Sequence, residues 1–462
     1  MVDSVPTMGM IPLGAPTPIG MPSAPAAEEK ETGHCSLHPQ SMCPAFGSLR
    51  VLTRVEGVQP VMATDQGCLY GLTFVTHFYG ARKSIIAPEI GSAELIGGTI
   101  MQGTIAACEA AAREPGVRVI PVLSLCVAET QGFAEEQLPK KIGDAEVILV
   151  RVPAYAIHSH PEAKDVALAA MLKRLADPRD PDVDNRSLLL LGEVFPADPM
   201  LIDQVLRRMG GSVATVLPGR TVDDFVMAGQ VGAVASLHPF YKQSLAVLRE
   251  KRVPVVGGAP VGSAGTEAWL RAVGRALGLD PETVTRVAAE EGQKIRDLIN
   301  AHPLSGRVIV SGYEGNELSY ARLLVEAGAT VPYVSTSIGP SPLTAVEDAY
   351  LRSHGTHEII YRKTLEHDLD ALDKYGADLV IGTTPFSAAA KERGIPAMYY
   401  TNLLSVRPFF MSAGVGATVE VIREALERGP RYHFMRDFFE DDGDPASNVM
   451  TIQPLAMTAA VD

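Results

Sequence analysis

Two stretches of the chain repeat the same order of elements, and this repetition constrains the fold more than any other feature. Residues 187–219, "SLLLLGEVFPADPMLIDQVLRRMGGSVATVLPG", and residues 306–337, "GRVIVSGYEGNELSYARLLVEAGATVPYVSTS", each read as strand, glycine, helix, glycine, strand. A glycine directly after a helix is typical of a left-handed cap. Apolar strands that alternate with amphipathic helices predict parallel sheets covered by helices.

A second pair of similar stretches follows the first. Residues 232–258 and 377–402 both run strand, x-Pro-Phe, helix, basic turn, x-Pro, strand. The linker "ADPRDPDVDNRS" (176–187) is dense in Asp and Pro, which is typical of a boundary. We therefore predict two similarly built α/β domains, at residues 185–300 and 305–438.

The region before them, residues 41–180, reads as another α/β domain. The chain of 462 residues is long enough for about three domains. The predicted fold class is α/β, with three Rossmann-like parallel-sheet domains and a disordered N-terminal arm. Strands are expected at 58–63, 82–88, 117–125 and 145–153, a flexible Pro/Gly/Met-rich arm at 1–40, and a flexible acidic tail at 439–462.

Charge and hydropathy exclude several classes of protein. A formal net charge of −14 argues against a general nucleic-acid binder. No run approaches the roughly 20 apolar residues that a membrane span needs. The N-terminus has no basic start and no continuous apolar core, so it is not a secretory signal. We expect a cytoplasmic protein.

Three of the five cysteines lie where a ligand site is expected. Cys126 follows the predicted strand 117–125, and Cys68 lies just past the predicted strand 58–63. In open parallel sheets, ligands bind outside the carboxyl ends of the strands. Cys43 lies where the N-terminal arm joins this domain, so the three thiols could converge. Three thiolates suit a soft metal or an iron–sulfur cluster, and another subunit could supply a fourth ligand.

Each cysteine also has a plainer interpretation, because free cysteine is often simply buried. Cys108 sits among alanines on a predicted helix and reads as core packing. Cys35 lies in the arm beside His34 and His38, but the second half of a zinc site is missing. The odd number of cysteines and the lack of a CxxC pair indicate neither a disulfide framework nor a zinc ribbon.

Nucleotide chemistry is not expected in this chain. It contains no Gly-Lys dipeptide, so it lacks the GxxxxGK[ST] phosphate loop. The stretch "SGYEGNEL" (311–318) follows a strand but lacks GxGxxG spacing. It also places Glu314 and Glu317 at a helix start, where they would repel phosphate.

The contexts of the three cysteines resemble a known family. "SMCPAFGSLR", "QGCLYGLTFVTHFYGAR" and "VLSLCVAE" are similar to segments of the nitrogenase-like reductases of tetrapyrrole biosynthesis, and most of all to the chlorophyllide a reductases. The resemblance continues in "LGEVFPADP", "SLHPFY" and "GGAPVGSAGTEAWLRAVG" and spans about residues 40–440. The motifs are long and occur in order, which makes the match specific. The resemblance also implies the fold of the nitrogenase component 1 subunits.

The resemblance implies an oxidoreductase of the CH–CH class that is active only as a complex. By motif position, Cys43, Cys68 and Cys126 would hold a [4Fe-4S] cluster together with one cysteine of a Z-type partner subunit. Two such pairs would form a heterotetramer. A separate ATP-hydrolysing reductase, the X-type subunit, would pass electrons to the cluster, so ATP is not bound here. The reaction implied is reduction of the C7–C8 double bond of ring B of chlorophyllide a, in bacteriochlorophyll biosynthesis.

The sequence departs from the wider superfamily at two points. Nitrogenase-type chains carry Ile-Gly-Asp-Asp after the third cysteine, whereas this chain reads "TQGFAEE" and keeps only Gly132. It also has no counterpart of the additional Cys and His that hold the nitrogenase active-site cofactor. Two alternatives stay open: the N-type subunit of dark-operative protochlorophyllide reductase, and a non-catalytic scaffold for clusters or cofactors.

A pigment pocket and a proton donor would complete the site. A flat, apolar ring needs an apolar, aromatic pocket, and "GLTFVTHFYG" (71–80) begins shortly after Cys68. Phe74, Phe78 and Tyr79 are candidate wall residues, although a helix with an apolar stripe more often packs on its own sheet. His77 is the candidate proton donor. The alternatives are His158 and His160, both expected on a loop after a strand, the partner subunit and the substrate's propionate.

Overall fold

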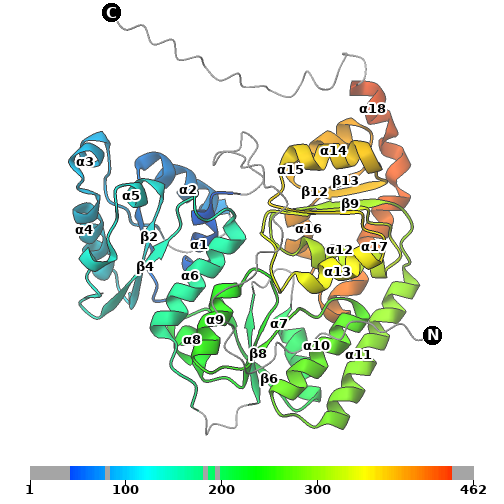
Figure 1. Cartoon of the computed structure of the whole chain (residues 1–462), viewed down its shortest axis with the longest axis horizontal. Coiled ribbons are helices and arrows are strands. Elements are labelled where there is room, and N and C mark those ends of the chain that lie inside the picture. Colours follow the sequence, from blue (N-terminus) through cyan, green and yellow to red (C-terminus); the bar gives the residue numbers. More distant parts are fainter. Residues whose placement is uncertain (1–41, 79–83, 181–185, 193–197, 440–462) are drawn as a thin grey trace, which may run out of the picture.

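The computed structural model describes residues 42–78, 84–180, 186–192 and 198–439 and contains three α/β units, each built on its own sheet (Figure 1). The described residues do not include the predicted arm at 1–40, which contains Cys35. They also do not include Tyr79 or the predicted tail from residue 440 onward. Within the described ranges, no helix is both long enough and apolar enough to cross a membrane.

The first unit contains all the cysteines that the structure describes. Its sheet has the order β1-β2-β4-β3, in which β1, β2 and β4 are parallel and only β3 is antiparallel to its neighbour. Its helices are α1 (Pro44–Leu52), α2 (Gln66–Phe78), α3 (Ser92–Gly97), α4 (Ile100–Ala112), α5 (Cys126–Thr130) and α6 (His160–Leu175), with a 3-10 turn at Glu135–Gln137. Its strands are β1 (Val61–Ala63), β2 (Val119–Ser124), β3 (Lys141–Ile142) and β4 (Ala145–Arg151).

The second unit has a parallel four-stranded sheet of order β6-β5-β7-β8. The order reverses between β5 and β7, which makes this pair the topological switch point. Its strands are β5 (Ser187–Leu191), β6 (Ser212–Leu217), β7 (Ala233–Ser236) and β8 (Val255–Val256). Its helices are α7 (Pro199–Arg208), α8 (Val222–Val226), α9 (Lys242–Glu250), α10 (Gly262–Ala276) and α11 (Pro281–Ala301), with a 3-10 turn at Met227–Gly229.

The third unit has a parallel five-stranded sheet of order β11-β10-β9-β12-β13, the doubly wound order with its switch point between β9 and β12. Its strands are β9 (Val308–Ser311), β10 (Tyr333–Thr336), β11 (Glu358–Tyr361), β12 (Leu379–Gly382) and β13 (Ala397–Tyr399). Its helices are α12 (Glu317–Glu326), α13 (Ala345–Ser353), α14 (Leu365–Tyr375), α15 (Thr384–Glu392), α16 (Tyr400–Val406), α17 (Met411–Glu427) and α18 (His433–Phe439), with a 3-10 turn at Gly429–Tyr432.

The predicted α/β class with parallel sheets is confirmed, and both pairs of repeated stretches form the predicted strand–helix–strand units. The glycines that close α7 and α12 have the positive φ of a left-handed cap, 88° at Gly210 and 103° at Gly328. The strand expected at 82–88 is wrong: among its described residues, Ile86 forms only an isolated bridge with Val61. The short antiparallel β3 was not anticipated.

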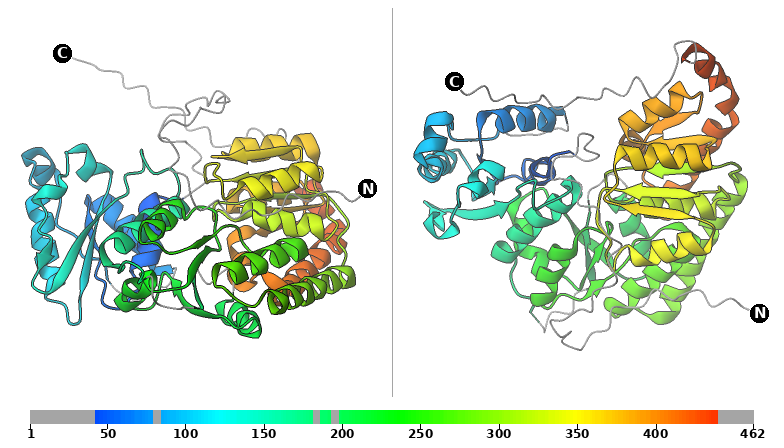
Figure 2. Two further views of the ribbon diagram at one scale, coloured as in Figure 1. Left: turned by 60° about the horizontal axis from the view of Figure 1, so that its bottom comes forward. Right: turned by 45° about the horizontal axis from the view of Figure 1, so that its top comes forward.

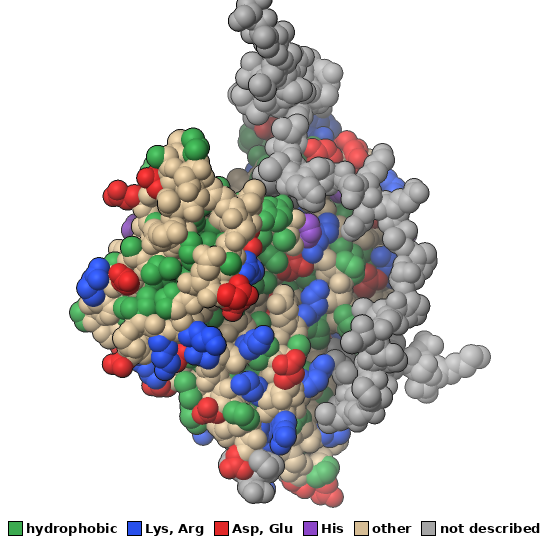
Figure 3. Space-filling model, turned by 60° about the vertical axis from the view of Figure 1, so that its left-hand side comes forward, with side chains coloured by type: hydrophobic (Ala, Val, Ile, Leu, Met, Phe, Trp, Pro, Cys, Tyr) green, Lys and Arg blue, Asp and Glu red, His purple; other side chains and the backbone are tan. Residues whose placement is uncertain are grey.

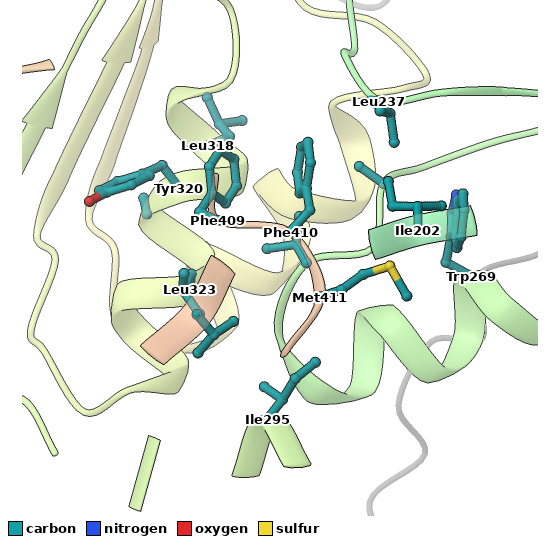
Figure 4. Packing of buried hydrophobic residues seen from close by; sticks show 14 of the residues in the cluster. Ile202, Leu237, Trp269, Ile295, Leu318, Tyr320, Leu323, Phe409, Phe410 and Met411 are labelled. Atoms are coloured by element: carbon teal, nitrogen blue, oxygen red, sulfur yellow. The ribbon is translucent and has the colours of Figure 1, made fainter. Parts of the chain in front are cut away.

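Two hydrophobic cores join neighbouring units. One runs between the first and second units and includes residues of α1, α6 and α9. The other lies between the second and third units, where Trp269 of α10 and Ile295 of α11 pack with Tyr320, Phe409, Phe410 and Met411 (Figure 4). The views in Figures 1 and 2 agree that the second unit lies against both of the others. Helix α17 of the third unit returns to pack on α11 of the second, so the two units share an interface. The boundaries predicted for separate domains stay a prediction.

Candidate functional site

Cys68 and Cys126 follow two neighbouring parallel strands of the first sheet. Strands β1 and β2 pair in register, with Ala63 opposite Ser124 at their carboxyl ends. The chain after β2 stays close to that edge, since the N–H of Leu125 donates to the carbonyl of Ala63 at 3.3 Å. The sequence placed both cysteines at this edge, and the structure places them there.

All three candidate cysteines lie at the start of a helix. Cys43 is the N-cap of α1, Cys68 lies in the first turn of α2, and Cys126 is the first residue of α5. The partial positive charge of a helix N-terminus favours the thiolate form, which is the form that binds metals. For Cys68 and Cys126 the strand-to-helix turns after β1 and β2 produce this arrangement, whereas Cys43 precedes the first helix of the unit.

The charges of the three thiols interact. Burial raises the pKa of the Cys43 thiol, N–H groups of Ala45 and Phe46 act against this, and the nearby Cys126 raises it further. Burial, followed by the charge of Asp65, raises the pKa of Cys68 to about 11, and Cys43 adds to the effect. The pKa of Cys43 thus depends on the charge of Cys126, and the pKa of Cys68 depends on the charge of Cys43.

The thiols differ in what surrounds them. Cys43 and Cys68 remain accessible to solvent, although neighbouring groups partly desolvate their thiols, and Cys126 is half-buried. The backbone N–H of Ala154 donates to the Sγ of Cys126 at 3.1 Å, and the carboxylate of Asp65 accepts the N–H groups of Gly67 and Cys68 at 2.8 and 3.1 Å. Sequence reasoning missed Asp65, although an Asp directly before a helix is a readable capping signal.

Within the described part of the chain, no three His, Cys, Asp or Glu side chains form a group that could hold a metal ion as they stand. The three cysteines lie in one electrostatic neighbourhood, and their role as ligands stays a prediction. Cys108 is fully buried in the core of the first unit, and burial raises its pKa to about 12. This agrees with the interpretation of Cys108 as a packing residue.

The candidate proton donors lie in different environments. His77 is exposed near the end of α2, and His158 is exposed in the loop before α6. His160, expected on a loop, is instead the first residue of α6 and fully buried. Burial lowers its pKa to about 4, so it is neutral at pH 7. Phe74 is 55% exposed and does not pack in the core.

The loop after β9 holds the protein's own carboxylate where dinucleotide folds hold a phosphate. Glu317, the first residue of α12, accepts the N–H of Glu314 at 2.8 Å and that of Gly315 at 3.0 Å. The hydroxyl of Thr336 donates to the same carboxylate at 2.6 Å. Glu317 is fully buried, so these donors are directed at a group inside the protein.

A small cavity lies at the carboxyl end of β7, between the second and third units. It is lined by residues that include Ser236, His238, Gly258, Ser319 and Glu347, and its volume of ≈ 10 Å³ is about what one water molecule needs. A cavity of this size has room for an ordered water molecule and not for a flat pigment.

The parallel sheets covered by helices agree with what similarity to known proteins shows. The model of the family "nitrogenase component 1 type oxidoreductase" matches residues 43–427, and the chain belongs to this family of oxidoreductases. Members of this family generally bind iron–sulfur clusters.

Among individual proteins, the chain is 39% identical over 415 residues to the chlorophyllide reductase 52.5 kDa chain of Rhodobacter capsulatus, covering 88% of this chain and 83% of that one. It is 22% identical over 264 residues to subunit N of the light-independent protochlorophyllide reductase of Mesostigma viride, covering 54% and 58%. The solved structure of nitrogenase Cp1 at pH 6.5 has a TM-score of 0.71 to it at 18% identity, covering 89% of this chain and 96% of that one.

Proposed function

We propose that this chain is the Y-type, cluster-bearing subunit of chlorophyllide a reductase. The observation that carries the proposal is the 39% identity to a chlorophyllide reductase chain over 88% of the sequence. The matches to subunits N and B of the protochlorophyllide enzyme are weaker, at 22% and 24% identity, although the second covers 86% of the chain. The reaction proposed is reduction of the C7–C8 double bond of ring B of chlorophyllide a during bacteriochlorophyll biosynthesis, in the cytoplasm.

Cys43, Cys68 and Cys126 are the proposed ligands of a [4Fe-4S] cluster. Three observations support this set: the thiols begin three helices, their charges interact, and Cys43 and Cys68 are exposed, which leaves them open to a fourth ligand from a partner subunit. When bound, such a cluster supplies single electrons. Saturating one carbon–carbon double bond takes two electrons and two protons. The N–H of Ala154 would donate to the ligand Cys126 and help to set the potential.

A partner of the Z type would cover the face of the first unit that carries the exposed thiols. Helix α2 buries only Leu72 and Thr76 among its residues up to His77, and it exposes the stacked rings of Tyr70 and Phe74. Hydrophobic side chains also gather on the face of the first unit in Figure 3. Exposed aromatic residues around an open site are typical of an interface between subunits. Two such pairs would form the heterotetramer.

The electrons would come from a separate ATP-hydrolysing component, the X-type reductase. The loop after β9 supports this division of labour, because its N–H groups donate to the buried Glu317. A phosphate would have to displace that carboxylate. His77, exposed and on the same helix as Cys68, is kept as the proposed proton donor.

The test is the iron and acid-labile sulfide content of the anaerobically co-purified complex with the Z-type partner. We expect about four of each per pair of subunits. Cys126→Ser should lose them, whereas the matched Cys108→Ala, which removes a buried core thiol, should keep them. No iron in an intact wild-type complex would overturn the cluster assignment.

A turnover assay decides the substrate. With the X-type reductase and ATP, we expect the complex to reduce ring B of chlorophyllide a and to leave ring D of protochlorophyllide unchanged. The opposite preference would assign the chain to the N-type subunits. Loaded complex that reduces neither pigment but transfers iron to an acceptor protein would indicate a scaffold.

A further inference from the structure

A single carboxylate of the third unit lies among three basic side chains of the first. The Oε2 of Glu314 is 3.3 Å from Nη1 of Arg50, 3.4 Å from Nε2 of His160 and 3.6 Å from Nζ of Lys164. Its other oxygen accepts a hydrogen bond from the hydroxyl of Thr401 at 3.2 Å. All five residues are buried, so these interactions act in a medium of low dielectric constant.

The partners of Glu314 come from the two helices of the first unit that pack on each other. Arg50 lies in the last turn of α1, while His160 and Lys164 lie in the first turns of α6. Glu314 itself lies in the loop between β9 and α12, at the carboxyl edge of the third sheet. The carboxylate therefore joins α1 and α6 to the third unit at one point.

Cys43, one of the proposed cluster ligands, is the N-cap of helix α1. Arg50 is seven residues further along, which is two helical turns on the same side and about 10 Å along the axis. A helix transmits a tilt at one end to the other end. The position of Arg50 against Glu314 thus bears directly on where the thiol of Cys43 lies.

Close packing makes the joint between α1 and α6 stiff. A Cβ at Gly47 would lie 1.8 Å from the carbonyl oxygen of His160, so the two backbones touch there. The hydroxyl of Ser48 donates to the carbonyl of Ala163 at 2.8 Å. The ring of Phe46, in the first turn of α1, lies 5.6 Å from the ring of His160, which is 5.6 Å from the ring of Tyr313.

The charge on Glu314 is maintained in spite of its burial. Burial acts to raise its pKa, but Arg50, Lys164 and His160 outweigh burial and hold the pKa well below its usual range. The group is therefore a carboxylate at neutral pH, and it faces two cations and a neutral imidazole.

We propose that Glu314 is a positioning residue for Cys43: it fixes the direction of α1 against α6 and the third unit, and so places the Cys43 thiol where it can complete the site with Cys68 and Cys126. The inference rests on the proposed cluster function. It adds a residue from a different unit, 271 positions along the chain from the ligand that it serves.

The test compares Glu314→Gln with a matched control, Asp368→Asn. Asp368 is also fully buried and pairs with Lys363 at 2.7 Å, but it bonds within the third unit, to Ser311, Tyr333, Ser335 and Lys363. Both variants are co-purified anaerobically with the Z-type partner. Thermal unfolding, iron affinity and the electron paramagnetic resonance spectrum of the reduced cluster are then measured.

We expect both variants to unfold at a lower temperature than wild type, and only Glu314→Gln to change the cluster. Its iron affinity should fall by about tenfold, the lower end for residues that orient a ligand, and its resonance spectrum should shift. Glu314→Asp, which keeps the charge, should recover part of the wild-type spectrum. If Glu314→Gln does not fold, Glu314→Gln combined with Lys164→Met restores the charge balance and should fold with a shifted spectrum.

The outcomes separate the two claims. Wild-type complex without iron would overturn the proposed function itself. The other outcome is a wild-type complex that holds iron, together with Glu314→Gln and the double variant that give the same spectrum and iron affinity as Asp368→Asn. That result would leave the cluster in place and overturn the positioning role of Glu314.

Discussion

The backbone N–H of Ala154 donates to the Sγ of Cys126 at 3.1 Å, which links the loop after β4 to the start of α5. Ala154 lies three residues after β4, and Cys126 lies two residues after β2, the neighbouring parallel strand. The bond thus follows from the sheet topology, because both segments leave the same edge. It also gives the proposed ligand a hydrogen bond that the backbone supplies.

Replacing Ala154 by proline removes this N–H and should lower the midpoint potential of the bound cluster. A donor to a ligand sulfur stabilises the reduced, more negative state more than the oxidised one. Loss of about 1 kcal/mol of hydrogen bonding corresponds to a shift on the order of tens of millivolts for one electron. A redox titration of the anaerobic complex measures it. Ala154→Gly keeps the N–H and should leave the potential unchanged; an equal shift in both variants would contradict the argument.

Gly47→Ala should destabilise the protein, because its Cβ would lie 1.8 Å from the carbonyl oxygen of His160. Helices α1 and α6 would have to separate, and we expect a loss of about 3 kcal/mol in the free energy of unfolding, the upper end for overpacking. Urea denaturation measures this loss. The matched control is Gly71→Ala on α2, where a Cβ meets nothing within 4 Å. It should stabilise by up to about 1 kcal/mol through helix propensity.

Periodic patterns allowed the first part of the site to be predicted from the sequence. Cys68 and Cys126 each follow an apolar strand, and parallel strands end at a common edge, so their proximity follows from local patterns alone. The caps at Gly210 and Gly328 were predictable for the same reason, since a glycine after a helical stripe indicates a left-handed residue. Even the unanticipated β3 had a signal, the two-residue Gly143-Asp144 turn before β4.

Contacts between distant segments could not be predicted in this way. Glu314 was noted only as a residue that would repel phosphate, and its partner Arg50 is 264 residues away. No local period connects a loop of the third unit with a helix of the first. His160 was expected on a loop, and its burial could not be predicted, because that burial depends on the packing of α6 against α1. Tertiary packing decides such positions.

Glu317→Gln should lower the stability of the third unit. The carboxylate accepts the N–H groups of Glu314 and Gly315 and the hydroxyl of Thr336, and an amide would direct an NH2 group at one of these donors. Hydrogen bonds to a charged group contribute about 1.5–3 kcal/mol each, so a loss of about 2 kcal/mol is expected. Denaturation at pH 7 measures it. Glu282→Gln is the control, since Glu282 is exposed in the first turn of α11 and should lose only a few tenths of a kcal/mol.

The stability of the protein should fall between pH 6.5 and pH 4, in part because of His160. Its pKa is about 4 in the folded protein, where burial disfavours the charged form, and about 6.5 when unfolded. In this window the unfolded chain binds the additional proton, so stability rises with pH and is lost as the pH falls. A shift of this size corresponds to at most about 3–4 kcal/mol.

His160→Gln isolates this contribution, because glutamine keeps a donor for Glu314 but does not titrate. The free energy of unfolding of wild type and variant is measured by urea denaturation at pH 7 and pH 5. We expect the variant to lose less stability between the two values than wild type does. Other buried groups titrate in this range, and burial raises the pKa of Asp165 to about 6, which contributes with the opposite sign. Their contributions are common to both proteins and cancel in the difference. Equal losses in the two proteins would mean that His160 does not take up a proton on unfolding in this window.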